Sequence, residues 1–146
     1  MSLHNHALYQ ITIKALLFKE ERILVLITPD NYIDFPGGRV DESERELAWT
    51  EALKREVSEE LGDSVIIGIG QTLFVSKRQY HKNGKTNYMA AIFFRCNYIT
   101  GEINLSDEHS NYEWLTQEEI LSSKLKFISE DERYQLVSLF RKSQKN

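Results

Sequence analysis

The sequence predicts an α+β protein in which a mixed β-sheet lies between helical layers. Strand-like segments come before and after one long run of helix-forming residues, and two motifs that open helices follow near the C-terminal end. The chain of 146 residues contains only two prolines, and no stretch rich in Gly, Ser or Pro divides it into halves. We therefore expect a single domain over residues 1–146.

The composition favours a globular protein and excludes several classes. With 41% hydrophobic and 27% charged residues, the chain has the material for a sizeable core. Its formal net charge of −4 argues against a general nucleic-acid-binding protein, which must neutralise many phosphates. No segment reaches the roughly 18 to 20 apolar residues of a membrane helix, and the N-terminus lacks the layout of a signal peptide. We expect a cytoplasmic protein with no membrane or nucleic-acid partner, and the sequence leaves a homodimer open.

The first strands are predicted to form a β-hairpin. Apolar residues recur with period two through residues 9–18, a polar turn follows at 19–22, and an apolar run occupies 23–27. A loop is expected at 28–34. The sequence Phe-Pro-Gly-Gly at 35–38 then excludes regular structure and allows another group to approach the backbone closely.

The central part of the chain predicts one long helix and a second β layer. Good helix formers extend from about residue 44 to residue 61, and Gly62 supplies a C-terminal stop. Residues 65–76 and 86–98 are rich in strand-forming side chains. The basic hairpin between them has Asn83-Gly84 at its tip, which is the sequence of a type I′ turn.

The remaining elements follow from alternation and capping motifs. One face of the later strand carries five side chains: Ala90, Ile92, Phe94, Cys96 and Tyr98. Cys96 is therefore interpreted as a small core residue and not as a nucleophile. A short strand is expected at 112–115, and Thr116 and Ser129 each have the spacing that opens a helix. The last helix is expected to bury four side chains: Leu136, Val137, Leu139 and Phe140.

Three glutamates share one face of the predicted central helix. At 100° per residue, Glu56, Glu59 and Glu60 fall within an arc of about 100° beside the arc that faces the core. Carboxylates at this spacing repel one another unless a cation neutralises them, and oxygen ligands suit Mg²⁺ or Mn²⁺. A solvated helix face is the alternative interpretation of the same residues.

The surroundings of these glutamates favour a metal site. Gly37 and Gly38 leave backbone groups open to a phosphate or a metal, which makes them candidate substrate-binding positions, with Gly38 also a candidate metal ligand through its carbonyl. Arg55 can pair with a nearby carboxylate and hold the segment 35–38, called the glycine loop below, against the helix. Taken together, these residues point to chemistry on a phosphate-containing substrate with a divalent metal.

The same segment resembles the signature of the Nudix hydrolase family (MutT-like), Gly-x5-Glu-x7-Arg-Glu-U-x-Glu-Glu-x-Gly-U, where U is aliphatic. The fixed positions are taken by Gly38, Glu44, Arg55, Glu56, Val57, Glu59, Glu60 and Gly62. Ten residues instead of seven separate Glu44 from Arg55, and Asp63 replaces an aliphatic residue. The insertion of three residues is expected between Glu44 and Ala52, where it affects Glu44, and Glu46 or Glu51 are candidates to replace it.

The resemblance implies a Nudix-type α/β/α sandwich and a pyrophosphatase activity. The substrate class is a nucleoside diphosphate linked to a further group, as in a nucleoside triphosphate, ADP-ribose, a nucleotide sugar or a dinucleoside polyphosphate. Gly38, Glu56, Glu59 and Glu60 resemble the ligands of Mg²⁺ or Mn²⁺, and Arg55 resembles the residue that orients them. A metal-activated water would attack one phosphorus while the other phosphate leaves. A nucleotide-binding or regulatory domain without activity is the alternative.

The remaining roles stay open at the level of sequence. Glu56 and Glu108 are the candidates for the general base that accepts the proton of the water. Arg39, directly after the glycines, is a candidate for binding polyphosphate oxygens. We expect His109 to face solvent, and Tyr80 has the spacing of a tyrosine in relatives that cleave dinucleoside polyphosphates.

Overall fold

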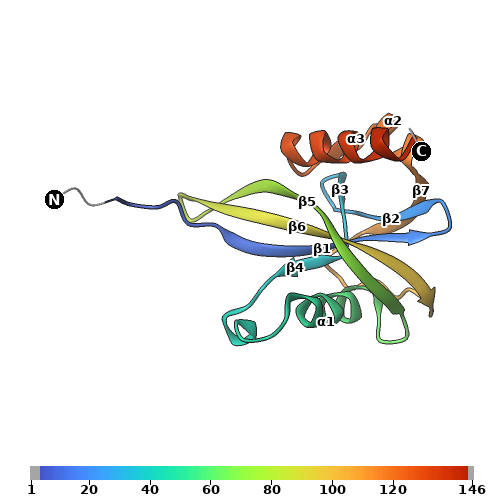
Figure 1. Cartoon of the computed structure of the whole chain (residues 1–146), viewed down its shortest axis with the longest axis horizontal. Coiled ribbons are helices and arrows are strands. Elements are labelled where there is room, and N and C mark those ends of the chain that lie inside the picture. The colour runs from blue at the N-terminus through green and yellow to red at the C-terminus, as the bar shows by residue number, and fades with distance from the viewer. Residues whose placement is uncertain (1–3, 145–146) are drawn as a thin grey trace.

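One curled sheet of eight strands forms the centre of the protein, and helices cover both of its faces (Figure 1). The structure, a computed structural model, describes residues 4–144. The sheet has the order β5-β6-β1-β2-β3-β8, with β4 paired to β1 and β7 paired to β2. The strands are β1 (Gln10–Lys19), β2 (Arg22–Ile27), β3 (Tyr32–Asp34), β4 (Gly37–Arg39), β5 (Ile66–Lys82), β6 (Lys85–Thr100), β7 (Asn111–Thr116) and β8 (Lys126–Phe127).

The helices lie on opposite faces of this sheet. Helix α1 (Trp49–Leu61) packs on one face, whereas α2 (Gln117–Ser122) and α3 (Glu130–Gln144) pack on the other (Figure 1). Each face has its own apolar core, and alternate side chains of β1 enter the two cores in turn. The predicted α+β sandwich with a mixed sheet between helices is therefore confirmed. The predicted domain also includes residues 1–3 and 145–146, which lie outside the described residues.

Strand β1 is the central strand, and it changes partners along one of its edges. One edge runs parallel to β6 over its whole paired length. The other edge pairs with β4 at Thr12–Lys14 and with β2 only at Phe18–Lys19. The chain between β3 and β4 therefore crosses at the middle of β1, where the Ala15 amide donates to the Pro36 carbonyl at 2.7 Å. This crossing places the glycine loop beside the centre of the sheet.

The Phe-Pro-Gly-Gly segment is more regular than predicted. Gly37–Arg39 form the short strand β4, because Gly37 has φ +132° and its backbone lies so close to β1 that a Cβ would be 2.0 Å from the Ile13 oxygen. The expected loop at 28–34 was also wrong in part, since it ends in β3, and β8, which pairs with β3, was not predicted. The expected β1–β2 hairpin is confirmed.

Helix α1 begins later than predicted. Glu42–Glu44 form a single 3-10 turn, residues 45–48 follow as a loop, and the helix starts at Trp49. The turn has its own N-terminal cap, in which the Asp41 amide donates to the Glu44 carboxylate. The inserted residues therefore lengthen a loop and leave the helix register unchanged.

Strands β5 and β6 belong to the same sheet as β1 and not to a second layer. Because β6 pairs with β1 along nine positions, the hairpin extends the sheet. The predicted type I′ tip is confirmed by the positive φ angles of Asn83 and Gly84, 52° and 71°. Cys96 is fully buried among apolar side chains, and burial raises the pKa of its thiol to about 12, as expected for a core residue.

The C-terminal elements follow the predicted capping motifs. Thr116 and Glu119 form a complete capping box at α2. At α3 the Ser129 hydroxyl accepts from the Glu132 amide at 3.1 Å, but the Glu132 carboxylate turns inward to other partners. Leu136 and Phe140 of α3 are buried, and its other apolar side chains are partly exposed. Within residues 4–144, no helix has the length and apolar character needed to cross a membrane.

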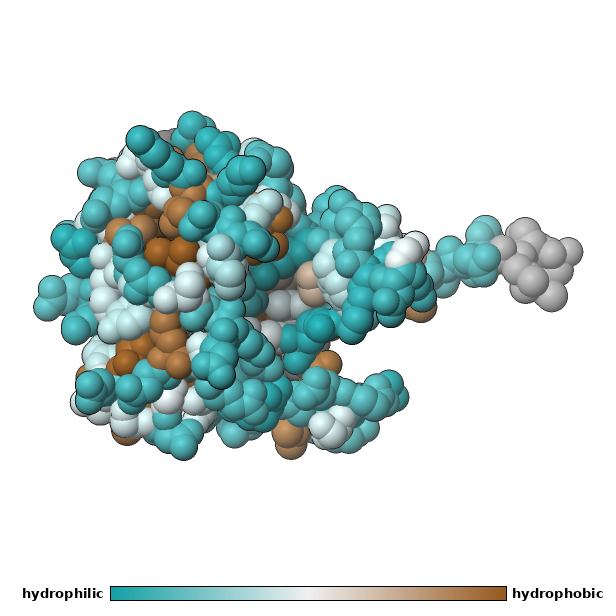
Figure 2. All heavy atoms as spheres, turned by 180° about the vertical axis from the view of Figure 1, so that it is seen from behind, coloured by the Kyte–Doolittle hydropathy of each residue, from teal (hydrophilic) through white to brown (hydrophobic). Residues whose placement is uncertain are grey.

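The surface of one face of the molecule carries polar side chains over most of its area. Figure 2 shows two brown apolar areas on this face that hydrophilic and intermediate side chains separate from each other. Several large apolar side chains are exposed at scattered places in the chain, among them Ile66, Val75 and Ile99. Such isolated exposed residues are common in folded proteins and define no particular surface.

Candidate metal centre and active site

Arg55 organises the acidic face of helix α1. Its guanidinium donates two hydrogen bonds to the Glu44 carboxylate, Nε to Oε2 at 2.6 Å and Nη2 to Oε1 at 2.8 Å. It also donates to Glu56 and to Glu59, each at 2.9 Å. These hydrogen bonds, the one to Glu44 foremost, raise the pKa of Arg55 and lower that of Glu44. The Arg55 guanidinium thus holds three carboxylates in place, two on α1 and that of Glu44 before it.

Glu44 keeps its place in this arrangement in spite of the inserted residues. Its side chain is 7% exposed, and a bidentate ion pair of this kind fixes orientation as well as charge. The alternatives proposed from the sequence do not occupy this position: Glu51 pairs with Lys54 at 3.4 Å, and Glu46 is exposed. The insertion therefore changes the loop and leaves the contact between Glu44 and Arg55 intact.

Glu56 lies against the backbone of the glycine loop. A Cβ on Gly38 would be 2.7 Å from the carboxyl carbon and from both carboxyl oxygens of Glu56. The position after Gly37 therefore requires a residue without a side chain if the carboxylate is to stay where it is. Burial raises the pKa of Glu56, and the neighbouring charge of Arg55 opposes that shift.

Glu60 is the most enclosed of the three glutamates. Its side chain is 4% exposed, and Oε1 accepts a hydrogen bond from the Gly37 amide at 2.9 Å. Oε2 has no hydrogen-bond partner among the residues that the structure describes. Burial raises the pKa of Glu60 to about 7, although Lys14 and the Gly37 amide act in the opposite direction. A buried carboxylate oxygen without a donor is the kind of group that a cation stabilises.

Glu59 is the most accessible of the three. Its side chain is 59% exposed and contacts Arg55 one helical turn earlier. The helix thus presents one enclosed, one partly enclosed and one open carboxylate. The sequence predicted that these residues share a face; the structure brings Glu60 to the Gly37 amide and Glu56 to Gly38, whereas Glu59 contacts Arg55.

A buried lysine that the sequence analysis missed holds the glycine loop from the other side. Lys14 of β1 donates from Nζ to the carbonyl oxygens of Phe35 and Gly37, both at 3.0 Å, and lies 3.3 Å from Asp34. Its side chain is 5% exposed. A lone lysine within an otherwise apolar strand was the signal for this contact, because a charge is buried only where it is paired.

Asp34 connects this lysine to a second buried cation. Arg78 of β5 donates to Asp34 at 3.1 Å and forms a bidentate pair with Glu132 at the start of α3, at 2.7 and 3.0 Å. Burial alone would raise the pKa of Asp34, but the charges of Lys14 and Arg78 outweigh it and hold that pKa well below its usual range. Arg78 belongs to the segment predicted as a basic hairpin, yet its side chain is only 6% exposed.

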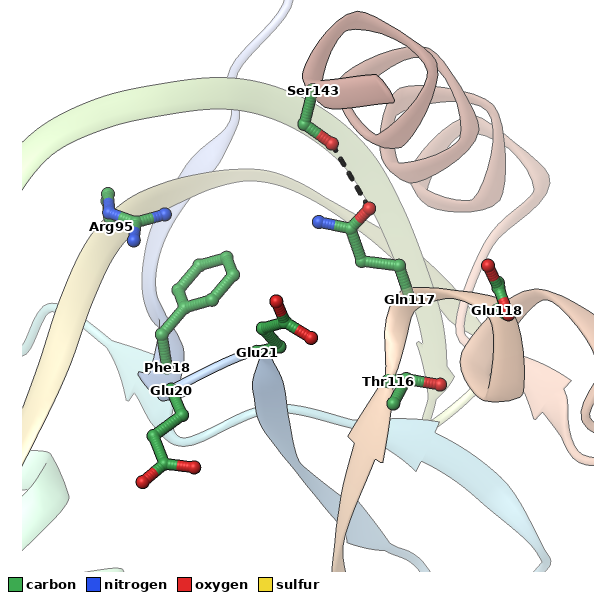
Figure 3. A pocket seen from close by; sticks show the side chains of 8 residues that line it. All are labelled: Phe18, Glu20, Glu21, Arg95, Thr116, Gln117, Glu118 and Ser143. Carbon is green, nitrogen blue, oxygen red and sulfur yellow. Dashed lines mark hydrogen bonds between the residues drawn. The ribbon is translucent and has the colours of Figure 1, made fainter. Parts of the chain in front are cut away.

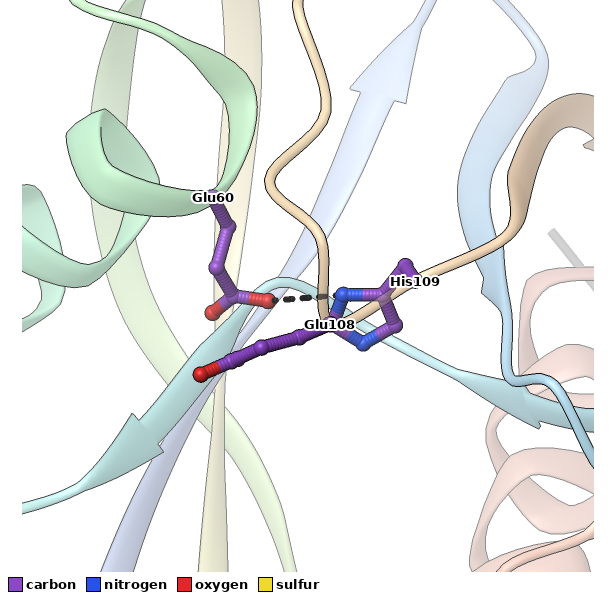
Figure 4. Close-up of side chains that lie close together, drawn as sticks. All are labelled: Glu60, Glu108 and His109. Carbon is purple, nitrogen blue, oxygen red and sulfur yellow. Dashed lines mark ion pairs between the residues drawn. The ribbon is translucent and has the colours of Figure 1, made fainter.

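The loop after β6 brings two further residues to Glu60 (Figure 4). Ligand atoms of Glu60, Glu108 and His109 all lie within 4.8 Å of one another. Glu108 is exposed, whereas the His109 side chain is only 8% exposed, so the expectation that His109 faces solvent was wrong. The reason is that residues 106–110 fold back over the end of α1, where the Ser106 amide donates to the Glu60 carbonyl at 3.0 Å.

Arg39 lies apart from the carboxylates, on the far end of β4. Its guanidinium donates to the Tyr80 hydroxyl at 2.5 Å and to Gln10 at 3.2 Å, and it stacks on the Tyr80 ring at 5.0 Å. A cavity of about 400 Å³ with Arg39, Asp41 and Glu42 in its wall lies beside this group. The structure therefore places Arg39 and Tyr80 together, at the end of β4 that follows the two glycines.

Another cavity, of about 500 Å³, lies at the turn between β1 and β2, facing α2 and the end of α3 (Figure 3). Figure 3 shows the Ser143 hydroxyl donating to Gln117 across it, at 3.1 Å, and Glu20, Glu21 and Glu118 around its rim. None of the candidate site residues lines this cavity. Its size alone gives it no chemical role.

The donor set at the glycine loop fits a divalent cation. Glu56, Glu59 and Glu60 share one helix face; the Glu56 carboxylate lies directly against Gly38, and Oε2 of Glu60 has no hydrogen-bond partner among the described residues. Oxygen ligands of this kind suit Mg²⁺ and Mn²⁺. The second group at the site, Glu108 with His109, adds an oxygen and a nitrogen.

Comparisons with known proteins identify the family and the fold. The model of the NUDIX domain family matches residues 8–137, so the chain belongs to the Nudix family. Among solved structures, a MutT protein from Methanosarcina mazei Go1 is 25% identical, with a TM-score of 0.74 over 92% of this chain and 95% of that one. A search of curated protein sequences gave no match.

Two further structures share the fold at lower identity. An ADP-ribose pyrophosphatase from Streptococcus suis is 17% identical, with a TM-score of 0.65 over 92% of this chain and 91% of that one. An Ap4A hydrolase from C. elegans is 21% identical, with a TM-score of 0.63 over 93% of this chain and 98% of that one. Proteins with this fold therefore carry names that refer to different pyrophosphate substrates.

Proposed function

We propose that this protein hydrolyses a diphosphate bond in a nucleoside diphosphate linked to a further group, with Mg²⁺ or Mn²⁺ as cofactor. The observation that carries the proposal is the position of two carboxylates at the glycine backbone: Glu56 lies against Gly38, and Glu60 accepts from the Gly37 amide while its other oxygen is buried without a hydrogen-bond partner among the described residues. The membership of the Nudix family and the likeness to the M. mazei MutT protein support it.

The proposed ligands are the Gly38 carbonyl and the carboxylates of Glu56, Glu59 and Glu60. When bound, the metal would neutralise charge on the diphosphate oxygens and activate a water. Arg55 orients Glu56 and Glu59 through its hydrogen bonds, and the Glu44 pair keeps the guanidinium in place. Lys14 and the Gly37 amide fix the loop that presents Gly37 and Gly38 to the substrate.

The general base and the substrate contacts are proposed on geometry. Glu56 and Glu108 are the candidates for accepting the proton of the attacking water, a role supported by the position of Glu56 against Gly38 and of Glu108 near Glu60. Arg39 would bind the outer phosphates, because it lies one residue after Gly38 and its guanidinium is exposed. We further propose a single cytoplasmic domain that acts on a small nucleotide-type substrate and not on nucleic acid.

The test is a hydrolysis panel with matched variants. The protein is incubated with Mg²⁺ and nucleoside triphosphates, ADP-ribose, nucleotide sugars and dinucleoside polyphosphates, and the products are read by mass spectrometry. Glu59→Gln should lower the rate by about a hundredfold or more, because it removes a ligand and leaves the fold intact. Glu51→Gln, an exposed glutamate on the same helix, should leave the rate unchanged.

Two results would argue against the proposal. Near-normal hydrolysis by Glu59→Gln would show that the ligand assignment is wrong. A lack of cleavage across the panel, with nucleotides still raising the melting temperature, would indicate a nucleotide-binding domain in place of an enzyme.

A further inference from the structure

Two buried polar atoms lie close to each other beside the proposed metal site but form no hydrogen bond. Nδ1 of His109 and Oε2 of Glu60 are 3.6 Å apart, and neither has a hydrogen-bond partner among the described residues. Their side chains are 8% and 4% exposed. Leaving such groups unpartnered away from water is costly, so their juxtaposition calls for a third group.

The separation of these atoms fits two ligands of one ion. A distance of 3.6 Å is longer than a hydrogen bond between nitrogen and oxygen. Two atoms bound to the same cation at about 2.1 Å are about 3.0 to 3.6 Å apart for bond angles of about 90° to 120°. Glu108, which is exposed, joins the same group: one ligand atom from each of Glu60, Glu108 and His109 lies within 4.8 Å of the others (Figure 4).

The other ring nitrogen of His109 has the surroundings of a metal-bound imidazole. Nε2 lies 3.7 Å from Oδ2 of Asp34, on the side of the ring away from Glu60. Histidine ligands of metals characteristically direct their second N–H to a carboxylate, which fixes the ring and its tautomer. Lys14 and Arg78 keep Asp34 in place through contacts at 3.3 and 3.1 Å, so this carboxylate is held rigidly.

We propose that His109 is a nitrogen ligand of a divalent metal that Glu60 and Glu108 also hold, and that the site therefore prefers Mn²⁺ or Co²⁺ to Mg²⁺. The preference follows because imidazole binds transition metals well, whereas Mg²⁺ takes oxygen ligands almost exclusively. This inference rests on the proposed function, since it uses the same Glu60, and it adds a nitrogen ligand and a metal preference to it.

The test measures metal binding directly. Mn²⁺ is added to the wild-type protein, and pulsed electron paramagnetic resonance detects whether a nitrogen nucleus is coupled to the bound ion. Calorimetry gives the affinities for Mn²⁺, Co²⁺ and Mg²⁺. His109→Gln retains the volume of the side chain, and His109→Ala provides a second substitution. The control is His81→Ala, which removes an exposed hairpin histidine whose Nδ1 contacts only Thr86.

We expect nitrogen coupling in the wild type and in His81→Ala, and its loss in both His109 variants. Affinity for Mn²⁺ and Co²⁺ should fall by at least about tenfold in those variants, with a smaller change for Mg²⁺. Bound Mn²⁺ without nitrogen coupling in the wild type, or coupling that persists in the His109 variants, would overturn the inference. If hydrolysis with Mg²⁺ is normal in that case, the proposed function stands. Failure of Mn²⁺ to bind, together with no hydrolysis, would overturn both.

Discussion

Gly37 and Gly38 are adjacent, yet an added methyl group would meet a different obstacle at each position. At Gly37 it would lie 2.0 Å from the Ile13 carbonyl oxygen, which is backbone, and φ is +132°. At Gly38 the three nearest atoms all belong to the carboxyl end of Glu56, at 2.7 Å. Because that end belongs to a flexible side chain, the chain can accommodate a Gly38 substitution by moving the carboxylate.

We predict that Gly38→Ala separates stability from activity. The free energy of unfolding should change by less than about 1 kcal/mol, since only the Glu56 side chain has to move. Mn²⁺ affinity and hydrolysis should each fall by at least about tenfold, because the moved carboxylate leaves the metal site. Gly68→Ala is the control, since its methyl group would meet only Ile99 at 3.8 Å. Normal activity of Gly38→Ala, measured beside chemical denaturation, would contradict the proposed role of Glu56.

The residues that the sequence analysis missed are those whose surroundings come from distant parts of the chain. The glutamates of α1 could be predicted, because helix geometry alone places them together. The environment of Asp34 could not, since it depends on Lys14 from one strand and Arg78 from another, 44 residues later. His109 was misjudged for the same reason, because its burial depends on Asp34 and Glu60.

At the level of elements, helix α3 is attached to the sheet by a buried ion pair. Glu132, in the first turn of α3, is fully buried, and Arg78 of β5 and the Ser76 hydroxyl donate hydrogen bonds to it. Arg78 also contacts Asp34, so it lies between two carboxylates. Removing the arginine would leave both carboxylates enclosed with one cation fewer.

Arg78→Met is therefore predicted to destabilise the protein by about 3 to 5 kcal/mol, as expected when one partner of a buried ion pair is removed. Adding Glu132→Leu should recover part of the loss, because an apolar pair of similar volume avoids the uncompensated charge. Arg133→Met, at the exposed position next to Glu132, is the control and should change stability by less than about 0.5 kcal/mol. Urea denaturation of the four proteins measures these values. A loss below about 1 kcal/mol in Arg78→Met would mean that the pair does not hold α3 to the sheet.

The elements themselves divide into those set by local sequence and those set by pairing. The end of α1, the hairpin tip at Asn83-Gly84 and the capping box of α2 were predictable, because each depends on a few consecutive residues. The start of α1 was not, since the separate turn at Glu42–Glu44 presents Glu44 to Arg55, 11 residues later in the chain. Strands β4 and β8 are short and exist only as partners of β1 and β3.

Across the whole molecule, a series of largely buried ionisable side chains lies between the two helical layers. The series runs from Glu132 through Arg78 to Asp34, which Lys14 also contacts, and then through His109, 3.7 Å from Asp34 and 3.6 Å from Glu60, to Glu60. It passes where β1 changes partners, and it joins helix α3 to the end of helix α1. Glu60 is the end of this series at the proposed metal site, and its raised pKa makes the stability of the whole protein depend on pH.

The direction of this pH dependence follows from the protonation of Glu60 in the folded and in the unfolded chain. Below its ordinary value of 4.5, Glu60 is protonated in both the folded and the unfolded chain. Between 4.5 and about 7 the folded protein keeps a proton that the unfolded chain has lost, so the stability of the metal-free protein falls as the pH rises. Above about 7 the loss is complete, and it amounts to about 3 kcal/mol.

Denaturation of the metal-free protein between about pH 5 and about pH 8 should therefore show a smaller decrease for Glu60→Gln than for the wild type. Mn²⁺ should offset most of this decrease in the wild type, because it binds the ionised carboxylate, and its stabilising effect should grow with pH up to about 7 and then level off. At a hundred times the dissociation constant this effect is about 2.7 kcal/mol. Glu60→Gln should lose most of it, whereas Glu46→Gln, at an exposed position, should behave as the wild type. Parallel pH curves for the wild type and Glu60→Gln would show that Glu60 does not titrate in this range and that another group couples metal binding to folding.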